Sequence, residues 1–305
     1  MKQQEHQNIL SYLKSAIGLL DFEQNLQLRK DVIFICDYIA NPSFRIAVFA
    51  PFNYGKSTLL NAILGNRTLP IDLIPTTGAA IIIQYGNELC TRLTMVDGRE
   101  INESGTEVLK RFAILDNDRC MRSDVTSIQV FCPHPFLHDV ELLDLPGTND
   151  KEAQDTLVRD QLLKADLVVQ VLDARKLMTL GEREHLRDWL IYRGIKTVVF
   201  VVNFLNLLES AEQKEVSNRL RSVAESFRSE LPNGISNLYR VDALPALRAR
   251  LKGDMSAVHS TGLAAFETAL QTIVAAQQEQ IADKRLPRLV AIATQVKQTK
   301  GRGTD

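Results

Sequence analysis

Apolar residues repeat at three- and four-residue spacing near both ends of the chain. This periodicity predicts amphipathic helices over residues 1–40 and over residues 262–298, with a breaker at residues 41–43 and Pro287 as a candidate for a break or kink. We expect the two apolar stripes to be buried against each other beside the core. The stripes consist of Ile9, Leu10, Leu13, Ile17 and Leu20, and of Leu263, Phe266, Leu270, Ile273, Val274 and Ile281.

Short runs of almost entirely apolar residues lie between these ends and predict strands that are covered on both faces. They span residues 44–50, 79–85, 126–132, 140–143, 167–172, 197–202 and 238–241. Helical patterns lie between them at residues 57–64, 152–164, 182–193 and 211–230. Strands that alternate with helices predict a three-layer α/β domain with a mostly parallel sheet.

Composition narrows the class of protein. The chain has 305 residues, 45% of them hydrophobic, and a net charge of −1. This is ordinary globular composition, and the balanced charge argues against a general electrostatic grip on nucleic acid. Cys36, Cys90, Cys120 and Cys132 form no CxxC pair, so we expect reduced thiols in a cytoplasmic protein. No secretory signal precedes the first helix, and the longest apolar stretch is too short to span a bilayer, so any membrane contact must be peripheral.

A phosphate-binding loop is predicted at residues 50–57. The run Ala-Pro-Phe-Asn-Tyr-Gly-Lys-Ser fits the template GxxxxGK[ST] except at its first position, where Ala50 replaces glycine. Gly55 permits the turn that aims backbone N–H groups at phosphate oxygens, and the following helix adds its positive end. We expect Lys56 to reach the β- and γ-phosphates, and the Ser57 hydroxyl to bind Mg²⁺.

Two further segments fit a phosphate and metal site. Asp144 ends an apolar strand and can hold Mg²⁺ through water, while the backbone of Gly147 can approach the γ-phosphate. Thr77 lies just before another strand, where its hydroxyl would complete the Mg²⁺ shell once a γ-phosphate orders the loop. We therefore assign Ser57, Thr77 and Asp144 to the metal.

The expected base-binding segment departs from its usual pattern. GTP-binding proteins carry [NT]KxD after the corresponding strand, but here Phe204 replaces the lysine and Asn206 the aspartate. An asparagine offers only one acceptor oxygen to the donors of guanine, and xanthine would suit Asn206 better. Asn203 fits the first position. Farther along, Asp242-Ala243 stands where a turn of the type SA[KL] contacts the base, and the Ala243 N–H is placed to reach guanine O6.

Taken together, these motifs resemble those of the bacterial dynamin-like proteins, within the dynamin superfamily. The resemblance covers residues 44–245, and the run TLGERE is typical of bacterial and mitofusin-type members. The motifs that carry it are residues 55–58, 75–77, 144–150, 179–183 and Asn203.

The resemblance implies a GTPase domain that binds Mg²⁺ with GTP or GDP and hydrolyses GTP, often when two such domains dimerise. It implies residues 1–42 as N-terminal neck helices, 43–250 as the GTPase domain and 251–305 as a C-terminal neck helix and tail. Members act at membranes, but this chain has no room for their long helical trunk. It is expected to be a fragment or a short relative that works with a larger dynamin-like partner, on the inner face of a membrane.

The same resemblance places the loop residues Phe52, Asn53, Tyr54 and Thr58 at the nucleotide. Eukaryotic dynamins use a glutamine where Phe52 stands here, and Phe52 cannot hydrogen-bond the attacking water. Asn53, the Thr77 carbonyl or a partner must then help, so we expect slow basal turnover. Lys56, Ser57 and Gly147 complete the expected catalytic set.

Two other functions fit the residues. A nucleotide-gated adaptor that binds but does not hydrolyse would explain Phe52 and Asn206. An Era-type GTPase would predict RNA binding, against which the near-zero net charge argues. The basic residues from Lys284 onward are interpreted as a solvated helix face.

Overall fold

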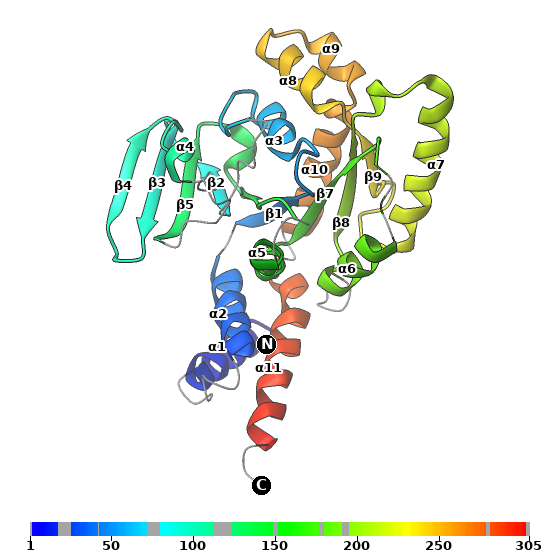
Figure 1. Ribbon diagram of the computed structural model, residues 1–305. Helices are drawn as coiled ribbons and strands as arrows, with labels where there is room; N and C mark the ends of the chain where they lie inside the picture. The colour runs from blue at the N-terminus through cyan, green and yellow to red at the C-terminus, as the bar shows by residue number, and fades with distance from the viewer. Residues whose placement is uncertain are drawn as a thin grey trace.

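A broad, twisted sheet forms the centre of the molecule (Figure 1). The computed structural model describes residues 2–17, 26–41, 43–71, 80–112, 124–148, 152–176, 178, 180–190, 195–278 and 281–302. Within them the strand order is β4-β3-β5-β2-β6-β1-β7-β8-β9. The strands are β1 (Phe44–Phe49), β2 (Ile81–Tyr85), β3 (Cys90–Met95), β4 (Glu100–Ser104), β5 (Val125–Cys132), β6 (Val140–Asp144), β7 (Leu167–Asp173), β8 (Val198–Asn203) and β9 (Leu238–Arg240).

The strands β6, β1, β7, β8 and β9 run parallel, as the alternation with helices predicts. The direction reverses at β2, which is antiparallel to β6 and parallel to β5. A hairpin of β3 and β4 then extends the sheet beyond β5. The predicted mostly parallel α/β sheet is therefore confirmed. Its parallel half brings the ends of β1, β6 and β8 to one edge.

Helices cover both faces of the sheet, which confirms the three layers. In β1, for example, Ile46 and Val48 pack with the helices of one face, and Ala47 and Phe49 with those of the other. On the first face lie α3 (Lys56–Leu64), α8 (Ala243–Leu251), α9 (Met255–Ser260) and α10 (Leu263–Gln278); on the second lie α5 (Glu152–Leu162), α6 (Leu180–Leu190) and α7 (Ser210–Ser226).

A separate helical layer lies below the sheet, with both ends of the chain (Figure 1). It consists of α1 (Lys2–Ile17), α2 (Leu26–Ala40) and α11 (Ile281–Arg302), which share a buried cluster including Leu13, Ile35 and Leu289. The expected burial of the two apolar stripes against each other is wrong. Leu263, Phe266 and Leu270 of α10 pack into the core of the sheet, and the N-terminal helices pack on α11 instead. Pro287 lies inside α11.

The spacing of apolar residues does not predict several elements. The stretch 86–112 contains β3, β4 and α4 (Leu109–Phe112), and two 3₁₀ turns occupy Pro135–Leu137 (η1) and Leu205–Leu207 (η3). The strand β3 alternates buried with half-buried residues, and β4 has no buried residue. Such an edge hairpin lacks the continuous apolar run that marks the central strands.

No helix in the described part of the chain is both long and apolar enough to cross a bilayer. Three of the four cysteines, Cys36, Cys90 and Cys132, are free thiols, and Cys120 lies outside the described residues.

Candidate functional site

The loop between β1 and α3 has the backbone that a phosphate-binding loop needs. Asn53 and Gly55 have positive φ angles of 65° and 86°, and α3 begins directly afterwards at Lys56. A Cβ atom on Gly55 would lie 2.2 Å from Nδ2 of Asn203, so the position requires glycine. No side chain caps the start of α3 within the described residues. Its first N–H groups therefore remain available for an anion.

A buried ion pair lies at the start of α3. The ammonium group of Lys56 contacts Oδ1 of Asp144, the last residue of β6. Burial raises the pKa of Asp144, and the charge of Lys56 opposes that rise. The second carboxylate oxygen, Oδ2, is buried and has no hydrogen-bond partner among the described residues. The pair thus leaves one acceptor unsatisfied where a metal ligand is expected.

The segment after Asp144 runs beside the phosphate-binding loop. The N–H groups of Leu145 and Thr148 donate to the carbonyls of Val48 and Ala50, both at 3.1 Å. A Cβ atom on Gly147 would lie 3.3 Å from Cα of Phe52, so glycine permits the close approach. The structure therefore brings Gly147 to the loop as the sequence predicts. Thr77 lies outside the described residues.

Asn203 connects the phosphate-binding loop to the expected base-binding segments. Its Nδ2 donates to the Tyr54 carbonyl at 2.9 Å, while its Oδ1 accepts from the N–H groups of Phe204 and Ala243 at 2.9 and 3.0 Å. The Ala243 N–H, expected to reach a base, is thus bound to Asn203 in this structure. Asn203 holds three segments in register, which explains an asparagine at the end of β8.

Next to Asn203, Phe204 forms a contact that the sequence did not predict. Its backbone has a φ of 63°, and the guanidinium of Arg175 lies 4.1 Å from its ring centroid. Arg175 is held by two hydrogen bonds to Asp173, at 2.9 and 2.7 Å. Lys176 approaches the ring of Tyr54 at 5.5 Å. Two cations therefore lie over aromatic rings here, Arg175 over Phe204 and Lys176 over Tyr54 of the phosphate-binding loop.

Asn206 and Asp242 are also brought together. The side chain of Asn206 is exposed, and its backbone N–H donates to Oδ1 of Asp242 at 3.2 Å. Arg240 donates to the other oxygen of Asp242 at 2.9 Å. Of the other predicted loop residues, Asn53 is exposed, Ser57 is half-buried and Thr58 is buried in the first turn of α3.

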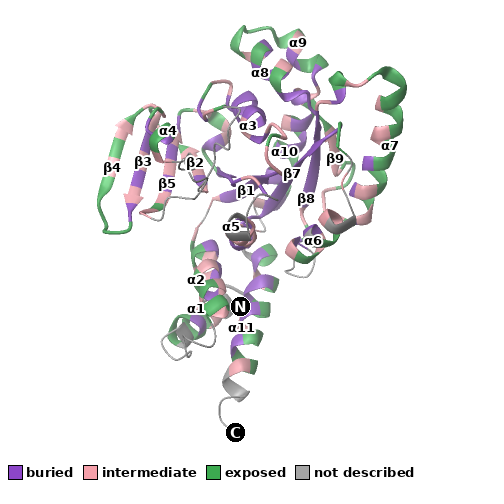
Figure 2. Ribbon diagram, viewed as in Figure 1, coloured by how far each residue is buried: buried purple, intermediate pink, exposed green. Residues whose placement is uncertain are grey.

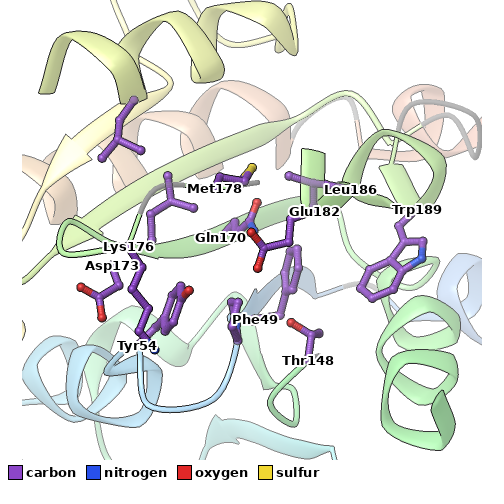
Figure 3. Close-up of a pocket in the computed structure, with 13 residues that line it drawn as sticks. Phe49, Tyr54, Thr148, Gln170, Asp173, Lys176, Met178, Glu182, Leu186 and Trp189 are labelled. Carbon is purple, nitrogen blue, oxygen red and sulfur yellow. The ribbon is translucent and has the colours of Figure 1, made fainter. Parts of the chain in front are cut away.

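A small cavity lies beside the loop, between β7 and α6 (Figure 3). Phe49, Tyr54, Gln170 and Trp189 are among its lining residues, and Oε1 of Gln170 has no hydrogen-bond partner among the described residues. Its volume is about 30 Å³, which is room for a water molecule or two. This cavity is therefore too small for a nucleotide.

The fold and loop define a P-loop α/β domain, and the comparisons with known proteins give its family. A model described as "Dynamin family" matches residues 46–205, so the chain belongs to the dynamin family. A bacterial dynamin-like protein of Nostoc punctiforme is 28% identical over 91% of this chain and 43% of its own length. Dynamin-like protein 2 of Campylobacter jejuni is 27% identical over 66% of this chain and 32% of its own length.

Solved structures show the same fold. A chain from an oligomerised bacterial dynamin pair, described as a mechanism for the long-range sensing and tethering of membranes, superposes with a TM-score of 0.60. It is 17% identical, and the match covers 98% of this chain and 55% of that one. The chain thus spans less than half the length of the two bacterial relatives named above.

Proposed function

We propose that this chain binds GTP together with Mg²⁺ and hydrolyses it. The observation that carries the proposal is the buried pair of Lys56 and Asp144 at the open start of α3, with Oδ2 of Asp144 unsatisfied. A lysine and a carboxylate at this point serve a phosphate and its metal ion in other P-loop proteins. Family membership supports the same activity, because dynamin-family proteins are GTPases.

The residues present fit a magnesium ion. Asp144 offers the unsatisfied oxygen, and Ser57 offers a hydroxyl in the first turn of α3; Thr77, proposed as a third ligand, lies outside the described residues. When bound, Mg²⁺ would neutralise charge on the β- and γ-phosphate oxygens. Lys56 would leave Asp144 for these oxygens, and the first N–H groups of α3 would hold them from the other side.

The attacking water has few partners in this chain. Phe52 lies against Gly147, where its ring cannot hydrogen-bond water, and the neighbouring Asn53 is exposed. We propose slow turnover alone and faster turnover when two GTPase domains meet across the nucleotide. The likeness to a chain from an oligomerised dynamin pair supports pairing, with a second copy or a larger dynamin-like protein. We further propose that the pair works on a membrane surface, as that pair is described to do, and not on nucleic acid.

A second function is favoured by the same two residues. Phe52 beside Gly147, and Asn206 in place of an aspartate, suit an adaptor that binds a nucleotide without hydrolysing it. Such an adaptor would change partners with the nucleotide and show no turnover at any protein concentration.

Binding and turnover measured on the same samples separate the two functions. Affinities for GTP and ATP in Mg²⁺ are measured by calorimetry, and phosphate release is followed across a protein concentration series. A preference for GTP, with a specific activity that rises with protein concentration, supports the dimerising GTPase. Tight binding without turnover supports the adaptor. Binding of ATP in preference to GTP would overturn the proposal.

A further inference from the structure

The base-binding segment lacks the expected carboxylate at position 206 but has one at position 242. Guanine presents two neighbouring donors, N1–H and its 2-amino group, and a carboxylate can accept from both. Asn206 has a single acceptor oxygen and a donor amide. Asp242 lies beside Asn206, and its Oδ1 accepts a hydrogen bond from the backbone N–H of Asn206 at 3.2 Å.

The contacts of Asp242 are unusual for its position. Asp242 precedes α8 and is 4% exposed, and an aspartate there ordinarily accepts from the first N–H groups of its own helix. Asp242 makes no such capping bond; Asn203, from another strand, accepts from the Ala243 N–H instead. Both oxygens of Asp242 serve the base-binding side, with Asn206 on one and Arg240 on the other.

We propose that Asp242 is a positioning residue that fixes which end of the Asn206 amide faces the base. A carboxylate oxygen accepts more than one hydrogen bond, so Oδ1 of Asp242 can also accept from the Asn206 side-chain NH₂. The amide oxygen then faces outward and accepts guanine N1–H. Without this anchor the amide turns freely, and its NH₂ pairs equally well with the 2-oxo group of xanthine.

The Asn206 side chain is exposed, and no hydrogen bond joins its amide to the described residues, so its bond to Asp242 would form when a base binds. Its backbone, by contrast, is held by Asp242. The inference rests on the proposed binding of guanine nucleotides, and it assigns their selectivity to the pair Asn206–Asp242.

The test measures the ratio of the GTP and XTP affinities by competition against a fluorescent guanine nucleotide. We expect the wild type to prefer GTP, and Asp242→Asn to reduce the ratio about tenfold, the value of one charge-assisted hydrogen bond. Asn206→Asp alone places two carboxylates together and weakens both nucleotides. The swap Asn206→Asp/Asp242→Asn returns one carboxylate and one amide, so it should recover the preference for GTP.

Asp254→Asn is the matched control. Asp254 also precedes a helix, but it accepts from the Ala257 N–H at 2.9 Å and so caps its own helix. Its replacement should lower stability and leave the ratio unchanged. If Asp242→Asn does not fold, Asn206→Ala at an exposed position serves instead, and the ratio should fall toward one.

The outcomes separate this inference from the proposed function. An unchanged ratio in folded Asp242→Asn or in Asn206→Ala, with GTP still bound, overturns the inference alone. A swap variant that binds no better than its two single variants also overturns it. If the wild type binds no guanine nucleotide, and the Lys56→Ala variant behaves in the same way as the wild type, the proposed function itself is overturned.

Discussion

Two buried aspartates lie at opposite ends of the parallel strands of the sheet, and they have very different surroundings. Asp166, just before β7, accepts from Nε and Nη2 of Arg285 at 2.9 and 2.7 Å, from the Tyr38 hydroxyl at 2.6 Å and from the Arg45 N–H at 2.9 Å. The carboxylate of Asp144, at the end of β6, pairs with Lys56 alone among the described residues, and its Oδ2 has no hydrogen-bond partner there. One carboxylate is complete within the protein, and the other has an oxygen left for a ligand.

The contacts of Asp166 with Arg285 and Tyr38 form the complete site, or junction, which joins the helical layer to the sheet. Arg285 of α11 is 2% exposed and also donates to the carbonyls of Tyr38 and Ser43, at 2.6 and 2.8 Å. Arg288, on the next turn, lies over the Tyr38 ring. Figure 2 shows buried residues extending from the sheet into the upper turns of α2 and α11. A fully satisfied buried ionic cluster makes a structure rigid, whereas an unsatisfied buried oxygen needs an explanation, such as a bound ion.

The largest effect is expected at the complete site. Arg285→Met leaves the buried Asp166 without its cation and should lower the free energy of unfolding by about 3–5 kcal/mol. Arg219→Met, which breaks an exposed pair with Glu215, should change it by less than about 0.5 kcal/mol. Urea unfolding followed by circular dichroism measures both. Equal costs in the two variants would contradict the importance of the junction.

A second comparison uses two lysines. Lys56→Ala removes contacts to phosphate and should weaken GTP binding about 100-fold, the value of about 3 kcal/mol. Lys164, whose ammonium lies 3.5 Å from Asp37 near the opposite end of the strands, is the control, and Lys164→Ala should leave the affinity within about twofold. Calorimetric titration tests both. Similar losses in the two variants would place the phosphate elsewhere.

The two aspartates themselves should differ in their effect on GTP affinity. Asp144→Asn leaves the buried ammonium of Lys56 without its carboxylate, so we expect the free energy of unfolding to fall by about 3 kcal/mol. The Mg²⁺-dependent part of GTP affinity should fall about tenfold. Asp166→Asn should lower the free energy of unfolding by about 3 kcal/mol and leave GTP affinity unchanged. A reversed pattern of GTP affinities would refute the distinction between the two ends of the strands.

The smallest expected effect is the loss of one hydroxyl at the junction. Tyr38→Phe removes the hydrogen bond to Asp166 and should lower the free energy of unfolding by about 1 kcal/mol at neutral pH. Burial raises the pKa of Tyr38, so the folded protein keeps the proton after the unfolded chain has lost it. This contribution is therefore fully present below about pH 10 and is lost as pH rises further. Unfolding measured from pH 8 to 11 should show a steeper alkaline loss in the wild type.

Much of the fold could be predicted because its signals are local. The buried strands are continuous apolar runs, and the turn at Gly55 with the helix at Lys56 follows from a short motif. The edge hairpin of β3 and β4 carries no such run. Similarly, residues 251–278 have the periodicity of a helix, but periodicity does not reveal that α10 packs on the sheet instead of on α11.

The ionic contacts could not be predicted, because their partners are distant in the sequence. The sequence predicts Arg285 on a solvated helix face, and this prediction is wrong, because Arg285 is buried and pairs with Asp166, 119 residues away. Asp242 and Asn206 lie 36 residues apart, and either alone looks like a departure from a motif. The local motif therefore predicts a phosphate site, while the structure was needed to find the contacts that hold the expected base-binding segments and the helical layer.

The central claim is tested most directly by phosphate release from GTP in Mg²⁺, compared between the wild type, Lys56→Ala and Lys164→Ala. The account predicts GTP turnover in the wild type that rises with protein concentration, is retained in Lys164→Ala and is abolished in Lys56→Ala. Turnover that survives in Lys56→Ala, or none in the wild type at any concentration, would contradict it.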